Sequence, residues 1–421
     1  MPRSRVMLAI AVCGGLALTG CGRSAQKGSP QAVSTLEAGA AKGTVTIWAQ
    51  GAEADQLPAL LKKFEAKNPD VTVKVTATPW GSAHDKYQSA IAAGATPDIG
   101  QIGTTWMGEF GRADAFAAVP ANFGATGFYS GSLASTEVEG AALGIPWYVD
   151  TPVLYYRTDL ARKAGFTSAP QNWDDLKRLA KALQSKAGAK YGIGLPPKDF
   201  QAFLPFAWSN GARLTTADDG RWTLDTPQMR EAVSYYRSYF TEGVADRTPS
   251  TDTGAVESTF VKGEVPMFIG GSYEVGQLNQ AGGAGFGDRY ATAVVPGRVS
   301  HTSFVGGGDL AVFKKSKNPT AAWKVLQFLS RPDTQAEWYR MTGDLPSVQS
   351  AWKAPALAHD TKLAVFGRQL KDVNSPPDTP QWAQVQAAGD AQMERVTTAG
   401  LAPAKAMRTL QSEAAAIGSG S

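Results

Sequence analysis

Cysteine is nearly absent from this 421-residue chain, which contains only Cys13 and Cys21. Cys13 lies within an apolar run from Val6 to Thr19. If that run is removed as an export signal, one cysteine remains and no internal disulfide can form. Ordinary hydrophobic cores must then stabilise the chain, whose length is typical of about two domains.

Histidine is almost as rare, and none of His84, His301 and His359 belongs to a His-Glu-x-x-His pair. A zinc-hydrolase site therefore has no support. The segment 270–274 ends in glutamate where a serine-hydrolase turn needs glycine. The glycine-rich segment 282–287 lacks the Lys-Ser/Thr of a phosphate loop and is interpreted as an ordinary loop. We predict no metal, no cofactor and no catalytic residue.

Charge is also sparse, at 19% of residues with a formal net charge of +4 at pH 7. The excess falls to two when Arg3 and Arg5 leave with the signal. No basic stripe indicates nucleic acid as a partner. Glycoside hydrolysis stays open as an enzymatic alternative because it needs only two carboxylates, and the chain has 37 acidic residues.

The N-terminus has the pattern of an export signal. Arg3 and Arg5 precede the apolar run from Val6 to Thr19, which is too short to span a bilayer. We therefore predict a signal peptide over residues 1–20.

The tetrapeptide Leu18-Thr19-Gly20-Cys21 resembles the bacterial lipobox, in which the cysteine is acylated and becomes the new N-terminus. This resemblance implies that Cys21 is lipidated and anchors the chain to the outer face of the cell membrane. An ordinary signal cut nearby, with Cys21 incidental, is the alternative. Residues 21–43, rich in Ser, Ala, Gly, Gln and Lys, are predicted to be a flexible linker.

Strand and helix patterns alternate from about residue 44, which predicts an α/β fold with a largely parallel sheet. Leu57, Leu60, Leu61 and Phe64 have helical spacing. Beyond residue 154 the pattern is more helical. Strand patterns fall at residues 44–48, 71–75, 97–102, 265–269 and 309–313.

Several segments, in order along the chain, resemble the sugar-binding lipoproteins of bacterial ABC importers. This large extracellular solute-binding family includes maltose- and trehalose-binding proteins. The similarity covers essentially the whole mature chain. It is carried by Pro97–Trp106, Ile145–Arg157, Phe260–Tyr273, Val305–Asp309, the helix pattern at 318–329 and Gly343–Pro346.

The resemblance implies a two-lobed periplasmic-binding-protein (Venus-flytrap) fold with three crossovers between the lobes and a sugar held between them. By motif, the crossovers fall near Val149-Asp150, Gly306–Gly308 and Gly343–Pro346. The implied N-terminal lobe spans residues 44–149 plus 308–343. The implied C-terminal lobe spans residues 150–307 plus 344–421.

A sugar presents apolar C–H faces and a rim of hydroxyls, so its site needs aromatic platforms and planar polar groups. The family uses an acidic residue at the position of Asp150 and often tryptophan at that of Tyr273. Gly306–Gly308 would let a ligand approach the backbone closely, unless these glycines serve only hinge flexibility. The implied sugar-binding residues are Gln50, Glu53, Thr105, Trp106, Trp147, Tyr148, Asp150, Gln201, Trp208, Tyr273, Gly307, Asp309 and Trp382.

Some of these residues have structural alternatives. Gln50 and Glu53 would be solvated loop residues if they do not bind sugar. Trp106 and Trp208 would be core residues. Trp80 fits either interpretation.

The resemblance implies a monomeric protein that captures a disaccharide or short oligosaccharide outside the cell and does no chemistry on it. Its implied partners are the permease subunits and cytoplasmic ATPase of an ABC importer. Besides a secreted glycoside hydrolase, a surface lipoprotein that binds a macromolecular partner remains an alternative.

Overall fold

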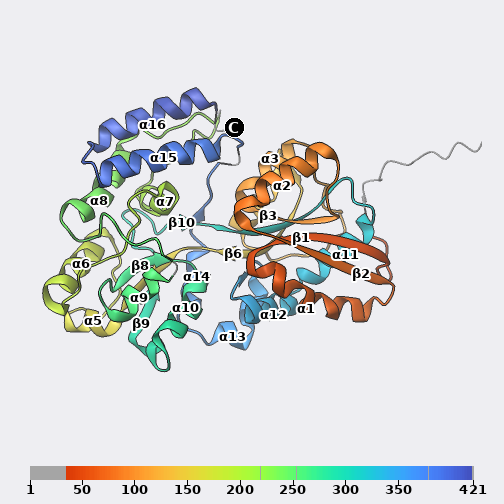
Figure 1. The fold of residues 1–421 in the computed structure, drawn as a ribbon, viewed down its shortest axis with the longest axis horizontal. Coiled ribbons are helices and arrows are strands. Elements are labelled where there is room, and N and C mark those ends of the chain that lie inside the picture. The colour runs from red at the N-terminus through yellow and green to blue at the C-terminus, as the bar shows by residue number, and fades with distance from the viewer. Residues whose placement is uncertain (1–34, 219, 253, 378, 420–421) are drawn as a thin grey trace, which may run out of the picture.

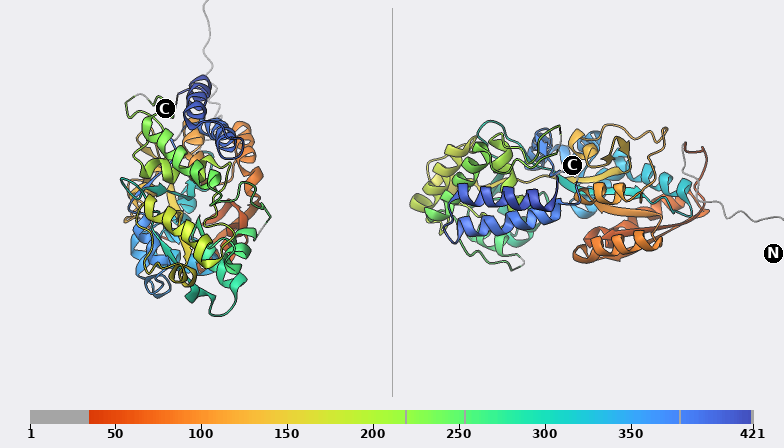
Figure 2. Two further views of the ribbon diagram at one scale, coloured as in Figure 1. Left: turned by 90° about the vertical axis from the view of Figure 1, so that its left-hand side faces the viewer. Right: turned by 90° about the horizontal axis from the view of Figure 1, so that it is seen from above.

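The computed structural model describes residues 35–218, 220–252, 254–377 and 379–419. The predicted signal peptide (residues 1–20) and Cys21 lie outside them. Two α/β bodies lie side by side (Figures 1 and 2). We call them the N-terminal lobe, built on a six-stranded sheet, and the C-terminal lobe, built on a three-stranded sheet. Within the described residues, no helix combines the length and apolar character needed to cross a membrane.

The N-terminal lobe takes its elements from both the first and the later part of the chain. Its strands are β1 (Gly43–Gln50), β2 (Val71–Thr78), β3 (Ile99–Gly103), β4 (Glu137–Val138), β5 (Ala141–Ala142), β6 (Ile145–Asp150), β11 (Gly306–Val312) and β12 (Leu345–Pro346). Its helices are α1 (Gly51–Lys67), α2 (Trp80–Ala93), η1 (Thr104–Trp106), α3 (Met107–Arg112), α4 (Ser130–Ala134), α11 (Pro319–Leu329) and α12 (Pro332–Thr342).

The large sheet has the strand order β12-β6-β11-β3-β1-β2. β1 pairs in parallel with β2 and β3, whereas β11 runs antiparallel to both β3 and β6. The sheet is therefore mixed rather than largely parallel as predicted. The prediction fails because β11 enters from the other lobe and so needs no helical crossover to reach its neighbours.

The core of this lobe follows the sequence periodicity. Val45 and Ile47 alternate inward along β1 and are fully buried. The predicted face of α1 is buried against the sheet, with Leu57, Leu60 and Leu61 at most 2% exposed. The period of two in β1 and the spacing of three and four in α1 thus determine which face of each element is buried in this core.

The C-terminal lobe contains more helix. Its strands are β7 (Val153–Arg157), β8 (Met267–Gly270), β9 (Tyr290–Ala293), β10 (Ser303–Phe304) and β13 (Val373–Asn374). Its helices are α5 (Thr158–Lys163), α6 (Trp173–Ala187), α7 (Phe200–Ser209), α8 (Pro227–Thr241), α9 (Ala255–Lys262), α10 (Tyr273–Gly282), η2 (Phe286–Arg289), α13 (Pro355–Ala358), α14 (Leu363–Gln369), α15 (Trp382–Thr397) and α16 (Pro403–Ile417). The short helix η3 (Gln349–Lys353) packs on α12 and β12 of the N-terminal lobe.

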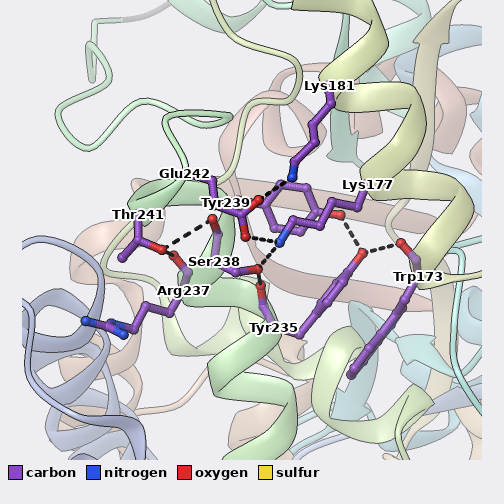
Figure 3. Close-up of polar contacts among 9 residues, drawn as sticks. All are labelled: Trp173, Lys177, Lys181, Tyr235, Arg237, Ser238, Tyr239, Thr241 and Glu242. Atoms are coloured by element: carbon purple, nitrogen blue, oxygen red, sulfur yellow. Dashed lines mark hydrogen bonds and ion pairs between the residues drawn. The ribbon is translucent and has the colours of Figure 1, made fainter.

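A polar network fixes α6 against α8 in this lobe (Figure 3). The Lys177 amine contacts the Ser238 hydroxyl and the Glu242 carboxylate. The Tyr235 hydroxyl donates to the Trp173 carbonyl at 2.6 Å, and the two rings stack with centroids 4.2 Å apart. The two helices therefore form one unit of the lobe.

Three short connections join the lobes. β6 leads to β7 through Thr151 and Pro152, and β10 leads to β11 through Val305. The third follows β12, which pairs with β6. This pairing places Leu345 and Pro346 in the sheet of the N-terminal lobe, whereas the sequence-based division ended that lobe at residue 343.

Part of the predicted linker is folded. Leu36 and Ala41 are buried in the core of the N-terminal lobe. The Leu36 amide donates to Asn122 Oδ1 at 2.7 Å, and the Ala41 amide donates to Asn68 Oδ1 at 2.8 Å. Burial of these two apolar side chains is the physical reason that residues 36–41 belong to the lobe rather than to a flexible linker.

Candidate functional site at the lobe junction

The end of β6 sends its side chains alternately to two sides. Trp147 and Val149 are each 1% exposed and lie in hydrophobic cores. Tyr148 and Asp150 are only half-buried. The two-residue period of a strand thus places Tyr148 and Asp150 on one face, directly before the first connection between the lobes.

Tyr148 is part of a hydrogen-bonded group within the N-terminal lobe. Its hydroxyl donates to Glu53 Oε1 at 2.8 Å, and Gln101 Nε2 lies 3.4 Å from both of these oxygens. Gln101 Oε1 in turn accepts from the Gln50 amide at 2.8 Å. Burial, followed by the Glu53 charge, raises the pKa of Tyr148 well above its usual value, so its hydroxyl stays protonated and can donate.

Gln50 is fully buried, and its Oε1 has no hydrogen-bond partner among the described residues. Its Nε2 donates to the Tyr87 hydroxyl at 3.2 Å. The backbone of Gln50 therefore holds the Gln101 side chain by a hydrogen bond, and the Gln50 side chain has one acceptor oxygen without a donor among the described residues.

Two tryptophans lie beside this polar group. Trp80 is 37% exposed, and its ring centroid is 5.6 Å from that of Trp106, which is half-buried in η1 next to Thr105. A Cβ built on Gly51 would be 2.9 Å from Trp80 Nε1 and 2.7 Å from Glu53 Oε2. Aromatic surface and carboxylate thus adjoin each other at the start of α1.

The C-terminal lobe contributes the β8–α10 turn. The Ser272 amide donates to Asp150 Oδ1 at 3.1 Å. Tyr273, the first residue of α10, is 53% exposed. A Cβ built on Gly271 would be 2.4 Å from Asp150 Oδ2 and 2.9 Å from Tyr273 Cε1. Gly271 therefore allows an exposed ring and a carboxylate from different lobes to approach closely.

Asp344 completes the junction from the short segment between α12 and β12. Leu345 pairs with Val149 in antiparallel register, so Asp344 continues the pairing opposite Asp150. Asp344 Oδ2 accepts from Trp338 Nε1 at 3.0 Å. Burial, and then the charge of Glu53, raise the pKa of Asp344 to about 7.

Glycines of β11 make room for Tyr148. A Cβ on Gly307, whose φ is +135°, would lie 2.2 Å from the Tyr148 carbonyl oxygen. A Cβ on Gly308 would lie 2.7 Å from Tyr148 Cε1. The close approach that these glycines permit is therefore to β6 of the protein itself.

Residues 48–336 match the model of a family described as bacterial extracellular solute-binding protein. The chain belongs to this family. Its relatives are substrate-binding proteins, so this solute-binding protein is not an enzyme, and the glycoside-hydrolase alternative falls.

Individual proteins that are similar to this solute-binding protein in sequence or structure support the family assignment. A putative binding protein of Brucella abortus is 30% identical over 335 residues, or 77% of this chain and 80% of that protein. The structure of the sugar-binding protein MalE of Xanthomonas citri matches with a TM-score of 0.85 at 31% identity, over 89% of this chain and 97% of that one. The GacH receptor of Streptomyces glaucescens shares the fold, with a TM-score of 0.79 at 24% identity over 89% and 98% of the two chains.

Three tryptophans expected to bind sugar lie in the cores of this solute-binding protein. Trp147 is 1% exposed and stacks on Trp338 with ring centroids 4.7 Å apart. Trp382 is 3% exposed and packs against Phe200, and Trp208 is 5% exposed. Burial of their large apolar area accounts for these positions. Trp208 stacks on Phe304, which directly precedes the second connection, with ring centroids 6.5 Å apart.

Two polar candidates also lie apart from the junction. Asp309 is 1% exposed on β11 opposite Ile102, and its Oδ2 accepts from the Ser135 hydroxyl at 2.9 Å. Burial raises its pKa well above the usual value. Gln201 is half-buried near the start of α7, and within the described residues no hydrogen bond links it to the junction.

Four junction residues escaped prediction from the sequence. Gln101 and Asp344 lie inside segments that carried the resemblance, and strand alternation could have singled out Gln101 as a partner of Gln50. The sequence left Trp80 undecided, and the structure shows its ring 37% exposed. For Glu274 the sequence allowed either a ligand or an acidic residue of a first helical turn, and the second interpretation was favoured.

Proposed function

We propose that this protein is the extracellular substrate-binding component of an ABC sugar importer and that it binds a disaccharide or short oligosaccharide at the lobe junction. The observation that carries this proposal is the convergence of exposed rings with carboxylates and amides from both lobes at one place. The likeness to the sugar-binding protein of Xanthomonas citri, at 31% identity, supports the same ligand class.

The proposed site keeps seven residues of the sequence-based set, namely Gln50, Glu53, Thr105, Trp106, Tyr148, Asp150 and Tyr273. It adds Trp80, Gln101, Glu274 and Asp344. Gly307 has a backbone role, and the four residues Trp147, Trp208, Asp309 and Trp382 stay in the cores. Gln201 is not included.

The chemistry of these groups suits a carbohydrate. The faces of Trp80 and Tyr273 would pack on apolar C–H surfaces, each contributing about 0.5–1.5 kcal/mol beyond area burial. Glu53, Gln101 and Asp150 would bond the hydroxyl rim, since an unpaired buried polar group costs about 1–3 kcal/mol.

Because Asp150 and Tyr273 adjoin each other across the lobes, one ligand can contact both lobes at once. Such a ligand stabilises a closed arrangement in proportion to its preference for that arrangement. We propose that the loaded, closed monomer then docks on the permease subunits, whose cytoplasmic ATPase drives import.

The same proposal includes a lipid anchor on Cys21 after removal of residues 1–20. Its support is the lipobox-like sequence Leu18-Thr19-Gly20-Cys21. Labelling cells with an alkyne fatty acid tests it: wild-type protein should take up the label and stay with membranes. A Cys21→Ala protein that is labelled equally would overturn the anchor and leave the sugar site untouched.

The transport function is tested by incubating the purified protein with a panel of disaccharides and oligosaccharides. The expected result is a raised melting temperature with at least one sugar and complete recovery of that sugar unchanged. If no sugar raises the melting temperature while a cell-surface protein co-purifies, a surface lipoprotein for a macromolecular partner replaces this proposal.

A further inference from the structure

Five carboxyl groups gather around the proposed sugar site. We call them the acidic cluster: Glu53, Asp150, Glu257, Glu274 and Asp344. Glu53, Glu257 and Glu274 are 9%, 7% and 6% exposed, and the other two are half-buried. The cluster draws on both lobes, because Glu53 begins α1 whereas Glu257 and Glu274 lie on α9 and α10.

The charged groups that raise the pKa of Glu274 and Asp344 are other members of the acidic cluster. Burial and then Glu257 raise the pKa of Glu274 to about 7, and Asp150 adds to the shift. Burial and then Glu53 raise the pKa of Asp344 to about 7, again with a contribution from Asp150. Burial and mutual repulsion thus disfavour ionisation of these carboxyls, and a positive charge placed among them would favour their ionised form.

No countercharge balances the cluster within the described residues. No lysine or arginine there forms an ion pair with any of the five carboxyls. A metal ion is not the missing charge either, because no three acidic, histidine or cysteine side chains in that part of the chain are placed to hold one.

A second, independent observation points to a ligand. Glu274 is 6% exposed, and its Oε2 has no hydrogen-bond partner among the residues described. The charges of Glu257 and Asp150 both act on its carboxyl, a Cβ built on Gly270 would be 3.1 Å from its Cγ, and it follows Tyr273, whose ring is exposed at the junction. A buried carboxylate oxygen with no donor is a costly arrangement that a cationic donor from a ligand would relieve.

We propose that the site selects saccharides by charge: it takes amino-saccharides in preference to their neutral parents and excludes anionic ones such as uronic acids and sugar phosphates. This inference rests on the proposed sugar-binding function. Hydroxyl groups satisfy hydrogen bonds but leave the net charge of the cluster unbalanced. An ammonium group on a sugar ring does both, whereas an added carboxylate or phosphate increases the repulsion.

The test is titration calorimetry of the purified protein with matched disaccharides at low ionic strength. Maltose, trehalose and cellobiose are each compared with derivatives in which one hydroxyl, at C2 or C6, is replaced by an amine, an acetamide or, at C6, a carboxylate. The acetamide controls for added size. For the parent that binds, we expect at least one amine derivative to bind about tenfold more tightly and the carboxylate about tenfold more weakly.

The outcomes separate the two proposals. If the neutral parent binds as tightly as every amine derivative, or if the uronic acid binds as tightly as the parent, charge selection is wrong while sugar binding stands. If no member of any series binds and no sugar of the wider panel raises the melting temperature, the sugar-binding function itself fails.

Variants locate the selection in the cluster. Glu274→Gln and Asp344→Asn keep hydrogen-bonding oxygens but remove charge, so each should lower the amine-to-parent affinity ratio about threefold or more. Asp309→Asn is the matched control, since it removes a buried carboxyl of the N-terminal lobe outside the cluster, and it should leave the ratio unchanged. An unchanged ratio in a folded Glu274→Gln protein would overturn the assignment even if Asp344→Asn fails to fold.

Discussion

The hydroxyl of Tyr148 donates a 2.8 Å hydrogen bond to Oε1 of Glu53, which joins β6, the strand of the first lobe connection, to the beginning of α1. The bond gives the Glu53 carboxylate a fixed orientation. It also leaves Glu53 Oε2 beside Trp80, where polar and aromatic surfaces meet. The pair is therefore the anchor of the proposed site in the N-terminal lobe.

Replacing Tyr148 with phenylalanine removes this donor while keeping the ring. We expect the free energy of unfolding to fall by about 1 kcal/mol and sugar affinity to fall about tenfold or more, because Glu53 loses its orientation. Urea unfolding and calorimetry measure the two effects. Tyr236→Phe is the control: its hydroxyl donates to the Pro196 carbonyl in the C-terminal lobe, so stability should fall and affinity should not.

Tyr273 is predicted to act through its exposed ring. Tyr273→Ala should weaken sugar binding about tenfold, the upper part of what an aromatic contact contributes, with no change in the melting temperature of the free protein. Tyr273→Phe keeps the ring and should bind nearly as the wild type does. Equal loss in both variants, measured by calorimetry, would assign the contribution to the hydroxyl instead.

Gly307→Ala should destabilise the protein by roughly 2–4 kcal/mol, since the residue has a positive φ and the new Cβ would clash with the Tyr148 carbonyl. Thermal and urea unfolding measure this loss. Gly276→Ala, in α10 with open space around the position, should change stability by less than about 1 kcal/mol, toward greater stability. Similar effects of the two substitutions would contradict the close packing described for β11 and β6.

Stability should depend on pH through Asp344. Its pKa is raised to about 7 in the folded protein from 3.8, so the folded state binds more protons than the unfolded state between these values. The free energy of unfolding therefore declines as pH rises through this window, by at most about 1.4 kcal/mol per pH unit for this group.

Asp344→Asn isolates that contribution. The variant should be more stable than the wild type at pH 8, and the difference should shrink toward pH 5, as urea unfolding at the two pH values can show. A difference that is the same at both values would mean that Asp344 titrates in the folded state as it does in the unfolded chain.

How far the sequence predicts this site depends on which signal each residue carries. The family resemblance singled out segments that meet at the lobe junction, so Tyr148, Asp150 and Tyr273 were among the residues it implied. It could not say which side of a strand faces the junction: Trp147 and Tyr148 are neighbours that point opposite ways, and both were predicted as ligands.

The remaining differences arise from contacts between distant segments. Asp344 reaches the site because β12 pairs with β6, and Asp309 stays in the lobe because β11 pairs with β3. The mixed sheet itself follows from a strand that returns from the other lobe. Pairings between residues more than a hundred positions apart leave no local periodicity by which a single sequence could reveal them.

A crystal structure of the protein with a bound disaccharide tests the proposed site most directly. We predict electron density for one sugar in simultaneous contact with Glu53 and Trp80 of the N-terminal lobe and with Tyr273 of the C-terminal lobe, and with Asp150 between them. Density for the sugar against one lobe alone, away from Asp150, would contradict the proposed site.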